Sequence, residues 1–284
     1  MATSGTEEQW DAVRASLRTT AGRFCELVSA VSDPDIRASA KWSVAEITAH
    51  VTSIAFIDTL LLEAAVPPFD MPDLTQAIAT TRVDEVHGLN DRVMSNFRER
   101  DPGRLVQMLR DQVDLMLTAS QSRDPGETFA WLGDSRLPLA GLLAHLVNEL
   151  LIHGNDIART VKVPWAMPPE DAALFFELFY VGLARGHIGR LLDGSRRPLD
   201  RRIAVELRSG YTTPVTIVVS NGRVTAEPLD SGADAMVRFD PATLNMMLFG
   251  RISRSRAILT GKLVIGGRRP WLLPAFLRTI RCPS

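Results

Sequence analysis

The feature that most constrains this chain is the segment 139–160, LAGLLAHLVNELLIHGNDIART, which keeps a helical apolar spacing along its whole length. Pro138 comes directly before it and suits the first turn of a helix, because proline has no backbone N–H to leave unpaired. The apolar residues that predict one core-facing side of this helix are Leu142, Leu143, Leu146, Leu150, Leu151 and Ile157.

A second face of the same helix carries His145, Glu149, His153 and Asp156. Steps of four residues advance about 40° around a helix, so Glu149 and His153 are neighbours one turn apart. A carboxylate and an imidazole in this relation can bind one divalent metal, and zinc takes such ligands at about 2.0–2.2 Å. The alternative interpretation is the polar face of an ordinary amphipathic helix, with Glu149 solvated.

A metal at this place needs a third ligand, and His50 is the best candidate. It lies in the second turn of a predicted helix that opens at Ser43, where Ser43 and Glu46 have the spacing of a capping box. Metal sites in helical bundles are built from side chains on facing helices. Two histidines and one glutamate would leave a coordination position open, as in catalytic zinc sites.

The other two polar residues of this helix each allow two interpretations. His145 is either a fourth ligand or a histidine of the surrounding pocket, and we prefer the second. Asp156 either hydrogen-bonds the second ring nitrogen of a ligating histidine or pairs with Arg159 on the surface. The sequence does not decide between these two roles of Asp156.

The rest of the chain divides into a helical part and a mixed part. Further helices are expected over 6–31, 43–65, 80–100, 104–122 and 170–192, and the segment 124–138 is expected to be a long loop whose Phe129 and Trp131 could cover a pocket. From about residue 194 onward, short alternating or β-branched segments predict strands at RRIAVELR, TPVTIVVS, RVTAEP, AMVRFD and KLVIGG. Helices are expected over 241–248 and 270–280, which makes this part α+β.

Composition excludes several classes of protein. A net charge of −1 argues against a broad nucleic-acid-binding surface. The two cysteines, Cys25 and Cys282, are too few for a disulfide framework. The first ten residues lack the basic and apolar regions of a secretion signal, and acidic residues interrupt the most apolar segments. We therefore expect a cytoplasmic protein without a membrane span.

Two motifs together resemble a known family. KWSVAEITAHV (41–51) and HLVNELLIHGNDIAR (145–159) are similar to the DinB-like metal-binding bundle of mycothiol-dependent maleylpyruvate isomerases. The segment 233–271, which begins ADAMVRFDPATLNMMLFGR, resembles a sterol carrier protein type 2-like domain. The resemblance implies a DinB-like four-helix-type bundle over 1–195, followed over 196–284 by a small sterol-carrier-like α+β domain.

The resemblance also implies a chemistry. The family's metal ligands correspond to His50, Glu149 and His153, its metal is expected to be zinc, and its thiol cofactor is mycothiol. An arginine of the second domain assists catalysis in the family, and Arg251 is the nearest candidate here. The expected activity is addition of the thiolate to an electrophile, in a cis–trans isomerase or a thiol S-transferase. The partners would then be a small-molecule thiol and its electrophilic substrate.

One alternative belongs to a different class of function. The chain could be a non-catalytic metal- or lipid-binding protein that uses its sterol-carrier-like tail. The apolar residues that could line such a tail pocket would equally form an ordinary core: Val237, Phe239, Leu244, Met247 and Leu248.

Overall fold

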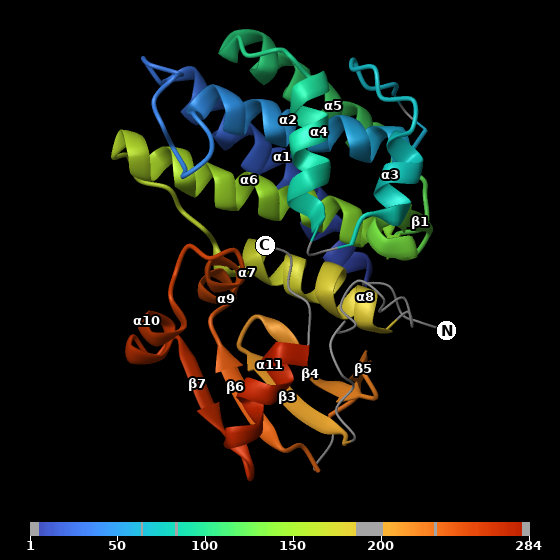
Figure 1. The fold of residues 1–284 in the computed structure, drawn as a ribbon, viewed down its shortest axis with the longest axis vertical. Coiled ribbons are helices and arrows are strands. Elements are labelled where there is room, and N and C mark those ends of the chain that lie inside the picture. The colour runs from blue at the N-terminus through green and yellow to red at the C-terminus, as the bar shows by residue number, and fades with distance from the viewer. Residues whose placement is uncertain (1–5, 64, 83–84, 186–200, 230–231, 280–284) are drawn as a thin grey trace.

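The computed structural model describes residues 6–63, 65–82, 85–185, 201–229 and 232–279. A helical N-terminal region is followed by a sheet-containing α+β C-terminal domain, and the two lie at opposite ends of the molecule in Figure 1. The predicted fold class is therefore confirmed.

Four long helices form the bundle at the centre of the N-terminal region. They are α1 (Glu7–Ser29), α2 (Val44–Leu61), α5 (Pro102–Ala119) and α6 (Leu139–Val161). Helices α1 and α2 each pack against both α5 and α6, so the four helices enclose one core. Helices α1 and α2 each begin with a capping box, at Thr6 and at Ser43. The second of these was predicted from the spacing of Ser43 and Glu46.

Helices α2 and α6 run in opposite directions, which matters for the site. At one end, the ring of Trp42, just before α2, lies 6.2 Å from the ring of His153 near the end of α6. At the other end, Arg123 donates to the carbonyl of Leu62, just after α2, and pairs with Glu127. The carbonyl of Glu127 in turn accepts from the backbone N–H of Leu139, the first residue of α6. Residues later in α2 therefore face residues earlier in α6.

Two sequence predictions in the bundle region are wrong. The helix expected over 80–100 is shorter, α4 (Val86–Asn96), and a separate helix before it, α3 (Leu74–Thr80), was not predicted. The short α3 forms because Leu74, Ala77 and Ile78 are buried in a second core cluster, which local periodicity does not reveal. The expected loop over 124–138 contains an antiparallel hairpin, β1 (Thr128–Trp131) and β2 (Ser135–Pro138), joined by the short helix η2 (Leu132–Asp134).

One continuous helix lies between the bundle and the sheet (Figure 1). It consists of α7 (Pro169–Leu174), the π-helical η3 (Phe175–Val181) and α8 (Gly182–Arg185). Its backbone approaches α6 closely, because a Cβ at Gly141 would lie only 2.8 Å from the carbonyl oxygen of Leu178. The rest of the helix predicted to residue 192, and the expected domain boundary at 195/196, lie outside the described residues.

The C-terminal domain is built on a five-stranded sheet of order β5-β4-β3-β6-β7. Strands β3 and β6 are parallel, and the other neighbours are antiparallel. The strands are β3 (Ile203–Ser209), β4 (Thr212–Ser220), β5 (Arg223–Glu227), β6 (Ala235–Phe239) and β7 (Leu263–Gly266). The helices are α9 (Pro241–Leu248), α10 (Arg254–Leu259) and α11 (Leu273–Thr279), the last preceded by η5 (Pro270–Leu272). Every strand expected in this part is present.

Buried contacts join the C-terminal domain to the helical region. The Asn245 amide on α9 donates to the side chain of Asn148 on α6 and to the carbonyl of Ala172 on α7, both at 3.1 Å. The rings of Phe176 and Phe239 are 4.9 Å apart. These contacts hold the segment after α9, which contains Phe249 and Arg251, beside α6.

Among the described helices, α2 is long and apolar enough to cross a membrane by length and composition alone. In the structure 72% of that stretch is buried inside the protein. It is the core helix of the bundle, and its burial explains its composition.

Candidate metal centre

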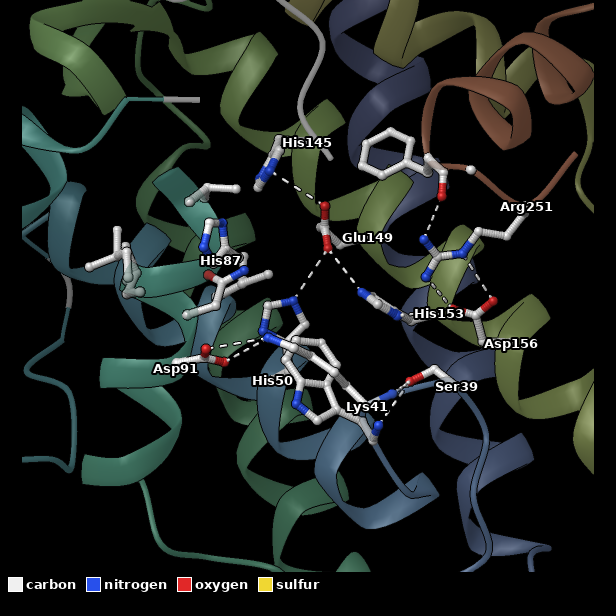
Figure 2. Close-up of a pocket in the computed structure, with 18 of the residues that line it drawn as sticks. Ser39, Lys41, His50, His87, Asp91, His145, Glu149, His153, Asp156 and Arg251 are labelled. Atoms are coloured by element: carbon white, nitrogen blue, oxygen red, sulfur yellow. Dashed lines mark hydrogen bonds and ion pairs between the residues drawn. The ribbon is translucent and has the colours of Figure 1, made fainter. Parts of the chain in front are cut away.

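Three buried side chains from two facing helices meet inside the bundle (Figure 2). His50 comes from α2, while Glu149 and His153 come from successive turns of α6. The Oε2 atom of Glu149 lies 3.3 Å from Nε2 of His153 and 3.7 Å from Nε2 of His50. One potential ligand atom of each residue lies within 4.8 Å of the other two. The structure thus brings together the three residues that the sequence suggested as metal ligands.

The donor set and its spacing fit a divalent metal. Two ligands at about 2.0–2.1 Å from a tetrahedral zinc ion lie roughly 3.3–3.4 Å apart. The observed separations of 3.3 and 3.7 Å between Glu149 and the two imidazoles are close to that value. Two imidazoles and one carboxylate suit zinc, although copper, iron and nickel accept the same donors. Trp42 covers the outer side of His50, with the ring centroids 4.5 Å apart.

Asp156 connects this cluster to the C-terminal domain. Its Oδ2 atom lies 3.4 Å from Nδ1 of His153, the ring nitrogen that faces away from Glu149. The same carboxylate accepts two hydrogen bonds from Arg251, at 3.1 Å from Nε and 2.5 Å from Nη2. A carboxylate behind a metal-ligating histidine fixes the orientation of the ring. The sequence left open whether Asp156 contacts a ligating histidine or Arg159, and in the structure its carboxylate faces His153.

His145 lies on the other side of Glu149. Its Nε2 atom is 3.6 Å from Oε1 of Glu149, the oxygen that does not face the other two histidines. Its ring stacks on Phe179 at 5.3 Å and meets the edge of Trp131 at 5.2 Å. The Nδ1 atom has no hydrogen-bond partner among the described residues. His145 therefore stands in an aromatic wall beside the three clustered residues.

Burial and charge act in opposite directions on the ionisable groups. Burial alone would raise the pKa of Glu149, but contacts with His153 and His50 outweigh it and hold that pKa well below its usual range. Burial lowers the pKa of His50 and, likewise, the pKa of His145. For His153, the carboxylates of Asp156 and Glu149 overcome burial and raise the pKa. Glu149 is thus an ionised carboxylate that faces imidazoles, which is an arrangement that attracts a cation.

The cluster opens into a cavity of about 760 Å³. This is within the size range of small-molecule sites, about 300–1,000 Å³. Exposed polar lining residues mark its mouth: Lys41, His87, Asp91 and Arg159. Lys41 pairs there with Asp91 at 3.3 Å (Figure 2). Aromatic side chains form much of the inner wall, including Trp131, Phe175, Phe179 and Phe249.

Sequence reasoning placed some lining residues and missed others. Of the two aromatic residues expected to cover a pocket, Trp131 lines the cavity, whereas Phe129 lies 5.1 Å from the guanidinium of Arg123. Asp58, a buried lining residue on α2, was missed. The signal was present, because an aspartate two helical turns after His50 interrupts the apolar run SIAFIDTLLL.

The fold and the cluster define a class of protein: a helical bundle with a candidate metal centre, followed by a sterol-carrier-like domain. Residues 17–158 match the family model described as the mycothiol maleylpyruvate isomerase N-terminal domain, and residues 190–268 match the SCP-2 sterol transfer family. The first match spans half of the chain. The chain therefore belongs to the mycothiol maleylpyruvate isomerase family, and it is a mycothiol-dependent maleylpyruvate isomerase-like protein.

One solved structure agrees with this fold, and a second is similar to the chain at a lower score. A crystal structure of a histidine-to-alanine mutant of mycothiol-dependent maleylpyruvate isomerase is 12% identical, with a TM-score of 0.51 over 90% of this chain and 92% of that one. A second crystal structure of mycothiol-dependent maleylpyruvate isomerase is 13% identical, with a TM-score of 0.45 over 86% and 90% of the two chains. A search of curated proteins found no match.

Proposed function

We propose that this protein is a zinc-dependent enzyme that activates mycothiol for addition to an electrophile, as a cis–trans isomerase or a thiol S-transferase. The observation that carries the proposal is the buried His50–Glu149–His153 cluster at the wall of a cavity large enough for two reactants. A metal held by these three residues would lower the pKa of a bound thiol and supply its thiolate near neutral pH.

The residues around the cluster have distinct tasks in this proposal. Glu149 supplies the negative charge that favours a cation, while His50 and His153 supply nitrogen ligands. Asp156 holds the ring of His153 in position through Nδ1. Trp42 and the aromatic wall exclude water from the reacting groups, which strengthens electrostatic interactions there. The family relationship supports mycothiol as the thiol.

Arg251 is proposed as the residue that binds an oxygen of the substrate. A guanidinium has five N–H donors, and three of them are used here, two by Asp156 and one by the carbonyl of Phe249. Two donors remain on a side chain that lines the cavity. Asp156 thereby positions Arg251 without using up its hydrogen-bonding capacity. For Arg251→Met we expect impaired turnover with normal zinc content, measured by steady-state kinetics and elemental analysis.

The first test is the metal content of untagged protein, measured by elemental mass spectrometry. Wild type should contain about one zinc per chain, because three ligands converge at one point. Glu149→Ala should lose it, since no carboxylate would then face the two histidines. Glu26→Ala, at an exposed position of α1, is the matched control and should keep its zinc.

The second test follows with zinc-loaded protein. Addition of mycothiol should produce ultraviolet absorbance of a metal-bound thiolate in wild type and in Glu26→Ala, but not in Glu149→Ala. Wild-type protein that stays free of metal after zinc has been offered would contradict the proposal. Apolar ligand binding by the C-terminal domain would then become the function to test.

A further inference from the structure

Asp58 is a buried acid that the proposed chemistry leaves without a role. The residue lines the cavity, and its side chain is fully buried with a relative exposure of 0%. Neither of its carboxyl oxygens has a hydrogen-bond partner in the described part of the chain. The neighbouring Thr59 differs, because its hydroxyl donates to the side chain of Gln112 at 2.7 Å. A buried polar group without a partner is destabilising, so its presence at a cavity wall indicates a ligand.

The position of Asp58 places it at the inner end of the cavity. From His50 to Asp58, α2 advances about 12 Å at 1.5 Å per residue. Because α2 and α6 are antiparallel, this advance leads away from Asp156 and Arg251 and toward His145. The surfaces there are apolar, with Ile54 one turn before Asp58 on α2, and with Trp131 and Phe179 against the His145 ring.

The charges of the lining residues separate the two ends of the cavity. Among the cationic side chains, Lys41 pairs with Asp91 at the mouth, Arg251 pairs with Asp156, and Arg159 is exposed. The cationic side chains of the lining thus lie at the mouth and beside the three clustered residues. The inner end combines apolar walls with three buried polar groups that have no hydrogen-bond partner among the described residues: the carboxyl group of Asp58, Nε1 of Trp131 and Nδ1 of His145. Burial raises the pKa of Asp58 well above its usual range, and the nearby Glu149 adds to this effect. A carboxyl group that is buried without a donor or a cation beside it favours its neutral form, and the neutral form can donate a hydrogen bond.

We propose that the inner end of the cavity binds a mainly apolar α,β-unsaturated carbonyl compound, and that Asp58 donates a hydrogen bond from its neutral carboxyl group to the carbonyl oxygen. This substrate class rests on the proposed thiol chemistry. When a thiolate adds to the β carbon, a C–S bond forms, the π pair of the C=C bond shifts to join the α carbon to the carbonyl carbon, and the π pair of the carbonyl moves onto its oxygen. The hydrogen bond from Asp58 stabilises the negative charge there, and loss of the thiolate reverses both changes. No oxidant or reductant is needed.

Binding of unreactive probes tests the proposal without any turnover. Benzylacetone carries an apolar ring and one carbonyl group, and butylbenzene is similar in shape but has no carbonyl group. Calorimetry on zinc-loaded wild type should show benzylacetone binding more tightly than butylbenzene and more tightly than maleate, a small dicarboxylate. With carbon-13 in its carbonyl group, bound benzylacetone should show a lowered carbonyl stretching frequency, which reports the accepted hydrogen bond.

Two substitutions at the same position test the hydrogen-bond donor, because leucine removes it and asparagine keeps one. Asp58→Leu should weaken benzylacetone binding about tenfold, as expected for loss of one buried hydrogen bond, and should abolish the infrared shift. Butylbenzene should bind this variant at least as well as wild type. Asp58→Asn keeps an N–H donor and should bind benzylacetone within about threefold of wild type. The matched control, Thr59→Val, changes a buried neighbour on α2 that does not line the cavity, and it should leave both affinities unchanged.

Three outcomes would overturn the proposal. Equal binding of the two probes by wild type would mean that Asp58 makes no hydrogen bond to the ketone. Equal losses in Asp58→Leu and Asp58→Asn would mean that a hydrogen-bond donor at this position does not account for the binding of the ketone, and preferential binding of maleate would exclude an apolar substrate. Zinc content of the same samples separates this proposal from the previous one. If zinc-loaded protein does not bind benzylacetone, only the proposed substrate class is contradicted. If wild-type protein does not bind zinc, the proposed zinc-dependent activity is contradicted.

Discussion

Two buried carboxyl groups, Glu149 and Asp58, line the same cavity from facing helices, yet their environments are opposite. Glu149 is surrounded by imidazoles at 3.3–3.7 Å, and its pKa is held well below the usual range although burial acts against this. Asp58 has no hydrogen-bond partner in the described chain, and burial raises its pKa well above the usual range. The surroundings of Glu149 thus favour its ionised form, and those of Asp58 favour its neutral form.

The difference shows how one cavity can serve two kinds of chemistry. The region around Glu149 is arranged for a cation, with donors that converge and a supporting carboxylate behind one of them. The region around Asp58 is mainly apolar, and its few buried polar groups, which include the Asp58 carboxyl group, have no hydrogen-bond partner among the described residues. Pairs of titratable groups whose environments push their pKa values apart commonly mark the division of roles in an active site. Each prediction below changes one member of this pair or a residue that supports it.

The largest effect is expected from removing a ligating histidine. His153→Ala should lower zinc affinity at least about 100-fold, because even residues that only support a ligand contribute about 10–100-fold. His145→Ala, one turn on the other side of Glu149, should keep its zinc, since His145 faces the other carboxylate oxygen. Competition with a chromogenic chelator measures both affinities. Equal losses in the two variants would make His145 a fourth ligand and would extend the cation-binding region into the aromatic wall.

A smaller effect is expected from the residue that supports His153. Asp156→Asn keeps the size of the side chain but removes the charge that faces His153 and Arg251. Zinc affinity should fall about 10–100-fold, within the range for such residues. Arg251→Met, which removes a group that contacts Asp156 but no ligand, should lower it less. If Asp156→Asn binds zinc like wild type, the carboxylate serves only to hold the C-terminal domain against α6.

The same contrast explains which parts of the site could be predicted from the sequence. The candidate ligands on helix α6 could be recognised in the sequence because a polar face, from His145 to Asp156, interrupts a regular apolar pattern. Helical geometry alone places Glu149 beside His153. The partner helix could not be found by spacing, because contact between His50 and Glu149 depends on how α2 packs against α6. His50 was chosen because its helix and the helix of Glu149 were both predicted to belong to one bundle, and the family resemblance implied the same residue.

Asp58 was missed for a physical reason. Helix α2 is buried on nearly all sides, so its sequence does not show which of its faces lines a cavity, although the aspartate itself stands out in an apolar run. The hairpin at 128–138 and helix α3 were missed for a related reason, since tertiary packing stabilises them more than local pattern does. The strands and α9 were predictable because their alternation and the Asp240–Pro241 start are local signals.

The smallest expected effect concerns stability, and it tests whether Asp58 is neutral. An acid whose pKa is higher in the folded state than in the unfolded state stabilises the fold at low pH. That stabilisation is lost as pH rises from the unfolded pKa through the folded one. Asp58→Asn cannot titrate, so relative to wild type it should gain stability as pH rises above about 4, the ordinary pKa of an aspartate in the unfolded chain. The gain should level off once Asp58 is ionised in both states of the wild type, because only a difference between the folded and unfolded pKa values makes stability depend on pH. Urea unfolding of metal-free samples at several pH values measures it. Parallel stability curves for the two proteins would mean that Asp58 has the same pKa in the folded and unfolded states. Asp58 and Glu149 would then differ in their location in the cavity but not in their protonation.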